Sequence, residues 1–301
     1  RWTAHTVSRH GQPRLVYTVA VTLKDEGEES AFAGASPCVA LRSRTDFSVR
    51  NGTEPLAHRP IVCGLGPAGL FAALLLARQG YRPIVLERGP ALDERVQAVE
   101  HFSATGELDP NANIQFGEGG AGTFSDGKLT TRVNDPMMAE ILQLFVDAGA
   151  PENILYEHKP HVGTDKLRAM VQGLSRRIAE LGGSVRYDAH VVDLDIKNNA
   201  VQGVILDGGE RLAAGAVVLA CGHSARDTYG MLIARGSEVV AKPISVGVRI
   251  EHRREDIDRL FYGKMAGHPD LGAAEYSTKP PAGCSCRMRH GCCLRRISIT
   301  A

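Results

Sequence analysis

The stretch RPIVCGLGPAGLFAALLLARQGYRPIVLERG, residues 59–89, decides the fold of this 301-residue chain. Arg59 to Cys63 is a short apolar run, and Ile84 to Leu86 is a second one. Between them, Pro67 to Gln79 has the composition of a helix, which Gly80 ends. A strand, a helix and a strand within about thirty residues have the length of a parallel crossover. The stretch therefore predicts a βαβ unit and a fold of the α/β class.

The turn from the first strand into the helix is a G-x-G-x-x-G motif made by Gly64, Gly66 and Gly69. Gly64 allows the tight turn, Gly66 lets a pyrophosphate approach the backbone, and Gly69 lets the helix pack close to the strand. Free N–H groups at the helix N-terminus would bind the pyrophosphate. Glu87, at the end of the second strand, is placed to accept hydrogen bonds from ribose hydroxyls and would repel the 2′-phosphate of NADP. We therefore expect an adenine-dinucleotide site, with a purely structural glycine turn as the alternative.

Between FAD and NAD, the residues favour FAD. Pro67 and Ala68 lie between the glycines, and position 87 is Glu rather than Asp, as in the FAD form of the motif. The glycine-rich stretch Asn111 to Lys128 could bring backbone amides against phosphate or flavin, with a flexible surface loop as the alternative. The loop residues expected at the cofactor are Gly117, Gly119, Gly120, Ala121, Gly122, Thr123, Ser125 and Lys128.

A third segment near the cofactor is expected after the apolar strand Ala216 to Ala220. It consists of Cys221, Gly222 and His223, whose small residues would let the chain pass close to a dinucleotide, although an ordinary strand end is the alternative. His223 is a candidate acid or base, and Lys128 could stabilise a reduced, anionic flavin. A structural histidine and a solvated lysine are the alternatives. No Cys-x-x-Cys pair exists, so Cys63 and Cys221 are interpreted as small buried hydrophobic residues.

Four regions are expected along the chain. Residues 1–57 would form a small α+β N-terminal domain, and 58–240 a Rossmann-like domain of three layers with a β-meander. Residues 241–278 would begin a second, incomplete substrate or cap domain, and 279–301 form an irregular, basic, Cys-rich tail. Helices are predicted at Arg95–Phe102, Pro136–Ala148 and Lys166–Leu181, and strands at Leu15–Leu23, Ser184–Tyr187, Val191–Ile196, Val201–Leu206, Glu210–Leu212 and Ile244–Glu251.

Charge and composition exclude several classes of protein. The net charge of +1 gives no overall field that would attract nucleic acid or an anionic membrane. The longest apolar run, Gly69 to Ala77, is too short to span a bilayer. Arg1 to Leu15 contains no apolar stretch typical of a signal peptide, and the chain begins with Arg, as a fragment or a processed product would. We therefore expect neither nucleic acid nor membrane as a partner, and leave the oligomeric state open.

The tail offers a rival interpretation as a metal or nucleic-acid site. Four of the seven cysteines lie there, at Cys284, Cys286, Cys292 and Cys293, and an odd total does not resemble a secreted disulfide framework. Zinc sites favour two to four residues between paired cysteines, and these spacings are shorter. The tail also lacks the aromatic residues that stack on nucleic-acid bases. We expect no metal site and a reducing compartment.

Six blocks of the sequence resemble a known family. They are GLGPAGLFAA (64–73), PIVLERG (83–89), NIQFGEGGAGTFSDGKL (113–129), KPHVGTD (159–165), CGHSARDT (221–228) and GVRIEH (247–252). Together they are similar to the uncharacterised FAD-dependent dehydrogenases of bacteria and plastids, within the glutathione-reductase-like flavoproteins. The resemblance implies a non-covalent FAD, with Gly64, Gly66, Gly69 and Glu87 at the ADP half. Arg88, next to Glu87, is also expected to bind the cofactor. It further implies that the Val192 backbone contacts adenine, that Gly222 approaches the pyrophosphate, and that the loop at 117–128 lies near the flavin.

The resemblance ends after about Glu275, and family members continue through a late glycine-rich segment that this sequence lacks. We therefore expect a relative truncated at its C-terminus, in the cytoplasm or the plastid stroma. The expected function is that of an FAD-dependent oxidoreductase with an unidentified small-molecule substrate. Because there is no second G-x-G-x-x-G, an electron donor such as NAD(P)H could bind only transiently, or the substrate itself could reduce FAD. The alternatives are a truncated, non-catalytic flavoprotein fragment that binds dinucleotide weakly or not at all, and an FAD-dependent monooxygenase.

Overall fold

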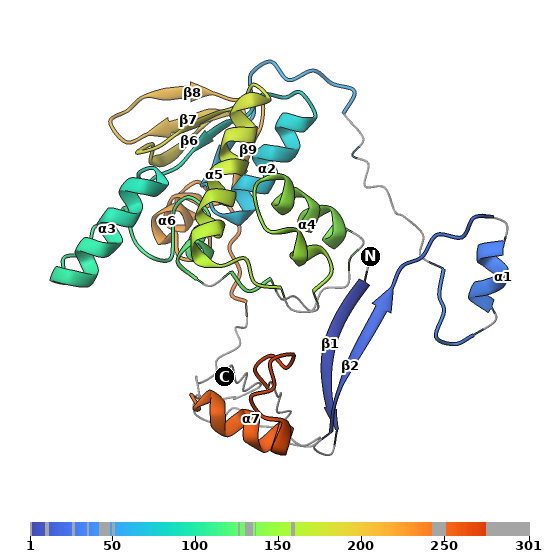
Figure 1. Ribbon diagram of the computed structural model, residues 1–301. Coiled ribbons are helices and arrows are strands. Elements are labelled where there is room, and N and C mark those ends of the chain that lie inside the picture. The colour runs from blue at the N-terminus through green and yellow to red at the C-terminus, as the bar shows by residue number, and fades with distance from the viewer. Residues whose placement is uncertain are drawn as a thin grey trace. The chain divides into compact units, whose positions relative to one another are not determined.

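The computed structural model of the chain describes residues 2–9, 12–25, 28–34, 36–41, 49, 52–125, 127–129, 135, 137–157, 160–242 and 251–274 (Figure 1). The chain divides into two compact units, one made of residues 1–29, 156–158 and 240–301, the other of residues 30–155 and 159–239. The tail at 279–301 and nearly all of the strand expected at Ile244–Glu251 lie outside the described residues. The predicted domain boundaries stay predictions.

A parallel sheet of four short strands lies at the centre of the larger unit. Its strands are β3 (Ile61–Cys63), β4 (Ile84–Leu86), β5 (Ser184–Arg186) and β9 (Val217–Leu219), in the order β5-β4-β3-β9. Every neighbouring pair is parallel. The predicted βαβ unit is confirmed, because helix α2 (Pro67–Arg78) connects the two central strands. Strands covered on both faces need continuous apolar residues, which explains the uninterrupted runs in the sequence.

The predicted β-meander is also confirmed, as a separate antiparallel sheet. It contains β6 (Val191–Lys197), β7 (Ala200–Leu206) and β8 (Arg211–Ala213), in that order. The first hairpin turns at Asn198 and Asn199, whose φ angles are 52° and 60°. Asparagine tolerates this left-handed region better than most residues, so the pair suits a two-residue hairpin turn.

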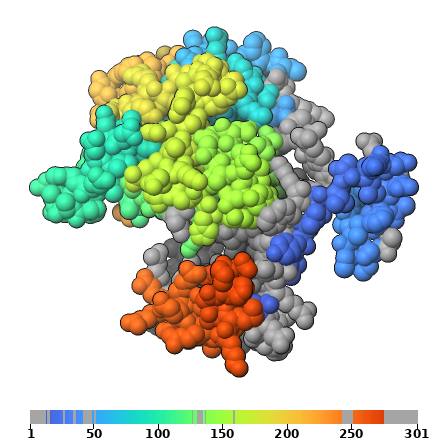
Figure 2. Space-filling view, viewed as in Figure 1, coloured from blue at the N-terminus to red at the C-terminus, as the bar shows by residue number. Residues whose placement is uncertain are grey.

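The meander packs against one face of the parallel sheet, and helices cover the other face. They are α2, α4 (Met137–Asp147) and α5 (Thr164–Glu180), and Figure 2 shows α4 and α5 side by side on the larger unit. Strand β3 shows how the layers divide, because Val62 packs among helix residues while Ile61 and Cys63 pack against the meander. The result is the three-layer α/β arrangement predicted from the sequence. Short 3-10 helices lie at Gly120–Phe124 (η2) and Glu152–Leu155 (η3).

The remaining elements include several that the sequence pattern did not reveal. In the smaller unit, β1 (Trp2–Arg9) pairs antiparallel with β2 (Gln12–Val19), and α7 (Arg254–Tyr262) precedes the 3-10 helix η4 (Gly263–Met265). Helix α1 spans Glu29–Gly34, and α6 spans Arg226–Ala234. Helix α3 runs over Leu92–Thr105, longer than the predicted Arg95–Phe102. Among the described residues no helix is long and apolar enough to cross a membrane.

Candidate dinucleotide site

A cavity of about 690 Å³ lies in the larger unit beside the carboxyl ends of β3, β4 and β9. Its walls are the glycine turn before α2, the end of β4, the glycine-rich loop, the start of β6 and the segment from β9 into α6. In open α/β sheets, ligands bind at this edge of the strands. The cavity therefore unites three segments that the sequence predicted to lie near one dinucleotide.

The three glycines of the turn have three different environments. Gly64 has a φ of +101°, and a Cβ there would lie 2.6 Å from the Ala220 carbonyl oxygen. A Cβ on Gly69 would lie 1.8 Å from the Gly64 carbonyl oxygen, so this glycine allows the helix to pack against the turn. A Cβ on Gly66 would meet nothing within 4 Å, although Gly66 lines the cavity. The missing side chain of Gly66 thus leaves space for a ligand rather than for protein atoms.

The N-terminus of α2 supplies donors for an anion at this point. Gly66 is the N-cap and Pro67 is the first helical residue; Pro67 and Ala68 both line the cavity. N–H groups in the first helical turn have no acceptor within the helix, and the helix dipole adds a partial positive charge. Gly222, with φ +79° and open space where its Cβ would be, also lines the cavity. These residues fit a pyrophosphate between two closely approaching backbone segments.

Glu87 ties the end of β4 to the glycine turn. The side chain is buried at 5% exposure, and its two carboxylate oxygens accept the Leu65 N–H at 2.7 Å and the Gly89 N–H at 2.9 Å. Each oxygen keeps a further lone pair, and Glu87 lines the cavity, so ribose hydroxyls could still donate to it. The sequence suggested the ribose contact but not this backbone role.

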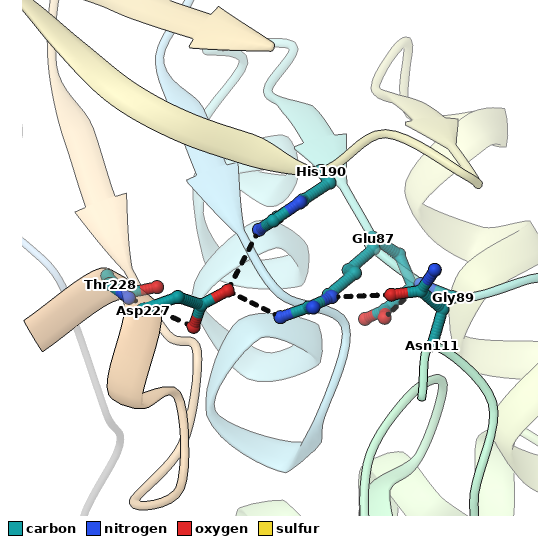
Figure 3. A network of polar contacts seen from close by, with 7 residues as sticks. Glu87, Gly89, Asn111, His190, Asp227 and Thr228 are labelled. Carbon is teal, nitrogen blue, oxygen red and sulfur yellow. Dashed lines mark hydrogen bonds and ion pairs between the residues drawn. The ribbon is translucent and has the colours of Figure 1, made fainter. Parts of the chain in front are cut away.

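A polar network surrounds the next residue, Arg88 (Figure 3). Its guanidinium donates to Asn111 Oδ1 at 2.8 Å and to Asp227 Oδ2 at 2.6 Å. His190 Nε2 lies 3.1 Å from the same Asp227 oxygen. Burial raises the pKa of Asp227, but the Thr228 N–H, Arg88 and His190 outweigh it, so the pKa is lowered overall. Arg88, Asn111 and His190 line the cavity, and the contacts of Asp227 hold the start of α6 beside it.

The glycine-rich loop joins the site through only part of its length. Gly117, Gly120 and Ala121 line the cavity. The loop attaches to the turn because Gly119 N–H donates to the Leu65 carbonyl at 2.9 Å. A Cβ on Gly120 would lie 2.8 Å from Cδ of Pro67, so the loop packs directly on the start of α2. The predicted contacts Gly119, Gly122, Thr123 and Ser125 are not among the lining residues.

Other predicted site residues lie inside and outside the cavity. His223 lines it. Lys128 is exposed, forms an isolated antiparallel β-bridge with His161 through the backbone, and is not a lining residue. Val192 is 40% exposed and is not a lining residue either, while its neighbour Val191 is. Cys221 lines the cavity together with Cys63.

The two cysteines at the cavity are poor nucleophiles. Burial, reinforced by Cys221, raises the pKa of Cys63 to about 12. Burial also raises the pKa of Cys221. Thiols with raised pKa values stay protonated near neutral pH, and the thiolate is the reactive form. This agrees with their interpretation as small hydrophobic residues. In the described part of the chain, no three His, Cys, Asp or Glu residues gather to hold a metal ion.

The chain is similar to several known proteins. A family model described as "FAD-dependent protein, C-terminal domain-like" matches residues 243–288. A protein of Clostridium beijerinckii (strain ATCC 51743 / NCIMB 8052), named "Uncharacterized protein", is 47% identical over 229 residues, which cover 76% of this chain and 43% of that protein. The chain thus spans less than half the length of this curated relative.

The chain also has a partial likeness to solved structures. THI4 of Thermovibrio ammonificans has a TM-score of 0.40 and 18% identity, covering 60% of this chain and 64% of that chain. L-proline dehydrogenase from P. horikoshii has a TM-score of 0.41 and 15% identity, covering 59% of this chain and 56% of that chain.

Proposed function

We propose that this chain binds FAD non-covalently in the cavity and that the protein it belongs to is an FAD-dependent oxidoreductase acting on a small molecule. One observation carries the proposal. A single cavity of about 690 Å³ joins the glycine turn, Glu87 and the glycine-rich loop. A nucleotide alone would need only the glycine turn and Glu87. The glycine-rich loop extends the cavity beyond them, as a flavin would require.

The ADP half of FAD would lie at the turn. The pyrophosphate would lie over Gly66 and the first turn of α2, with Gly222 on the other side, where neither glycine has a Cβ to obstruct it. Glu87 would accept hydrogen bonds from the ribose hydroxyls through its remaining lone pairs. Adenine would lie near His190 and Val191 at the start of β6. A 2′-phosphate would meet the Glu87 carboxylate, so NADP is not expected at this site.

The flavin half would extend toward the glycine-rich loop. Gly117, Gly120 and Ala121 offer backbone without bulky side chains along this wall. FAD, when bound, supplies the capacity to accept and pass on electrons. The residues of the chain bind it, orient it and exclude water from it. His223, on the cavity wall, is proposed as an acid or base, and Lys128, outside the lining residues, is the weaker candidate for stabilising a reduced flavin.

The family model supports the choice of FAD, since its description names an FAD-dependent protein and it matches residues 243–288 of this chain. A small-molecule substrate is part of the same proposal, together with either a transiently bound NAD(P)H donor or reduction of FAD by the substrate itself.

Purification of the chain, followed by desalting and visible spectroscopy, tests the proposal. We expect flavin absorption bands and, after acid release and chromatography, FAD at close to one per chain. Titration of the FAD-free protein with FAD, NAD+ and NADP+ provides the control, and FAD should bind most tightly. A folded, colourless protein that cannot be reconstituted with FAD would refute the proposal.

A further inference from the structure

We infer that Arg95 is a positioning residue that assembles the glycine-rich wall of the cavity before the cofactor binds. Arg95 lies on α3 and is 0% exposed, a rare state for an arginine. It is not a lining residue of the cavity, so it would act through the loop and not through contact with FAD. The inference rests on the proposed FAD site, but it concerns the loop even without FAD.

The guanidinium of Arg95 holds both arms of one loop segment. Nε donates to the Asn113 carbonyl at 3.0 Å and Nη2 to the Ile114 carbonyl at 3.3 Å. On the other arm, Nη1 donates to the Glu118 carbonyl at 2.7 Å and Nη2 to the Gly120 carbonyl at 3.1 Å. The intervening residues Gln115, Phe116 and Gly117 all line the cavity. One buried side chain thus fixes both ends of the segment that forms this wall.

The sequence of the loop fits closely around this guanidinium. A Cβ on Gly117 would lie 2.9 Å from both Cδ and Nε of Arg95, so glycine is needed there for the loop to close. The guanidinium carbon of Arg95 also lies 4.9 Å from the Phe124 ring centroid, within the range of a cation–π contact. Burial lowers the pKa of Arg95 to about 10, with Glu87 and Glu118 opposing the shift, so it stays charged near neutral pH.

The side chain of Glu118 anchors the same loop to three other elements. Its carboxylate accepts the Leu92 N–H at 3.1 Å and the Ser175 hydroxyl at 2.5 Å, and it is 2% exposed. Tyr187 also hydrogen-bonds to Glu118. Burial raises the pKa of the Tyr187 phenol most, and the charge of Glu118 and this hydrogen bond raise it further. The positive charge of Arg95 interacts electrostatically with the negative charge of the Glu118 carboxylate. Removing the guanidinium would leave four loop carbonyls without their donor and the buried carboxylate without this nearby positive charge.

Lysine cannot replace this arginine. An ammonium group presents three donors from one point, whereas the planar guanidinium presents five donors in a fixed fork. The four carbonyls lie on two arms of the loop and are reached by three different nitrogens of the guanidinium, whereas an ammonium has one nitrogen and only three N–H donors. Arg95→Lys therefore keeps the charge and releases the loop.

Arg168 provides a matched control on the same ring. Its guanidinium carbon lies 5.5 Å from the Phe124 ring centroid, and its Nε is buried without a hydrogen-bond partner among the described residues. Arg168→Lys would thus keep the charge and change the cation–π contact with Phe124, without removing the bonds that Arg95 makes to the loop carbonyls. Wild type, Arg95→Lys and Arg168→Lys should all be compared in the FAD-free state and with FAD.

The first measurement is hydrogen exchange of the FAD-free protein. In Arg95→Lys we expect peptides containing the Gly119 and Gly120 amides, bonded to the Leu65 and Gly117 carbonyls, to exchange at least about tenfold faster. Amides of the parallel sheet, such as Ile61 and Ile84, should keep their wild-type rates. An equal acceleration in both regions would show that Arg95 merely stabilises the whole domain, and would overturn the inference.

The second measurement is the FAD dissociation constant from flavin fluorescence. We expect Arg95→Lys to weaken binding at least about tenfold, and Arg168→Lys to change it less than about threefold. Unchanged exchange and unchanged affinity in Arg95→Lys would refute the inference. If the wild type itself binds no FAD, the proposed function fails while the exchange experiment still decides the role of Arg95.

A second variant covers the case in which Arg95→Lys does not fold. Phe124→Leu removes the ring beside Arg95 but none of the four hydrogen bonds. Phe124 is half-buried, and we expect a smaller acceleration of exchange confined to the same loop amides. Exchange rates equal to wild type across the loop would count against the inference.

Discussion

Replacing the three glycines of the turn by alanine, one at a time, separates folding from binding. Gly66 has φ −68° and ψ −178°, which alanine adopts without strain, and a Cβ there meets nothing within 4 Å. Reduced freedom of the unfolded chain would stabilise Gly66→Ala by about 0.4–1 kcal/mol. Alanine is a poorer N-cap than glycine, which offsets most of that gain. We therefore expect the unfolding free energy of the FAD-free protein to stay within about 1 kcal/mol of wild type.

The same substitution should strongly weaken FAD binding. The added methyl group would occupy the space in which the pyrophosphate approaches Gly66 and the first turn of α2. A hydrogen bond to a charged group contributes about 1.5–3 kcal/mol, so displacing the phosphate from one or two N–H groups should cost about 3 kcal/mol. That corresponds to a roughly hundredfold rise in the dissociation constant. Urea unfolding measures the stability, and FAD fluorescence quenching measures the affinity.

Gly69→Ala provides the contrasting result. Its Cβ would lie 1.8 Å from the Gly64 carbonyl oxygen, so the helix must move away from the turn. Overpacking of this kind costs about 1–3 kcal/mol or more, and the loss should appear in the FAD-free protein. The reasoning would be refuted if Gly66→Ala bound FAD within about threefold of wild type, or if both variants lost stability equally.

Three further predictions concern the same site. Glu87→Gln should lower the unfolding free energy by about 1–3 kcal/mol and weaken FAD binding. The reason is that its amide NH2 would face one of the two backbone N–H donors that Glu87 accepts at 2.7 and 2.9 Å. Urea unfolding measures the first effect, and FAD titration measures the second. The pKa of Cys63 rises from 9.0 to about 12 on folding, so the unfolded state loses this proton first, and stability present below pH 9 is lost toward pH 12. Urea unfolding of Cys63→Ala should show a shallower alkaline decline, by up to about 1.4 kcal/mol per pH unit, and an identical decline would contradict the assigned shift. Finally, Arg88 is paired with Asp227 at 2.6 Å, and the phosphate contacts are proposed to be backbone N–H groups, so the FAD dissociation constant should change less than about threefold between 0.05 and 0.5 M NaCl; a steep salt dependence in a fluorescence titration would point to unpaired cationic side chains instead.

The sequence revealed the parts of the fold that local pattern encodes. Residues 59–89 contain both strands, the helix and the turn in one contiguous run, and each glycine in the turn has a distinct steric reason to be glycine. The strands of the meander were also predictable, because short apolar runs of strand length are local signals. These predictions did not require knowledge of which segments meet in space.

Contacts between distant segments could not be predicted in this way. The sequence around Arg95 predicts only a helix, and nothing in its neighbours signals that its partners lie at Asn113 and Gly120. Asp227 was missed as a partner of Arg88 because α6 is short and contains Gly230 and Thr228, which are weak helix formers. Arg95 combines a charge with complete burial, and burial becomes visible only once the elements are packed.

Val192 stays a prediction. The resemblance implies a contact between its backbone and adenine, and its neighbour Val191 lines the cavity at the start of β6, while the side chain of Val192 is 40% exposed. Side chains on a strand alternate between faces, but a main-chain contact does not depend on that alternation. The exposed side chain therefore does not decide whether the Val192 backbone meets the ligand.

The proposed site binds its ligand mainly through the backbone, and side chains mainly hold that backbone in place. The proposed pyrophosphate contacts use main-chain N–H groups at Gly66, Ala68 and Gly222, where glycines and a small residue leave the backbone accessible. We expect such a site to tolerate substitutions on its walls better than at the glycines. A Cβ at these glycines would occupy either the space of the ligand or that of an adjacent backbone segment. The same logic makes Arg95 important although it is not a lining residue. A glycine-rich loop has little intrinsic order, so its shape must be imposed from outside, and four hydrogen bonds from one buried guanidinium impose it.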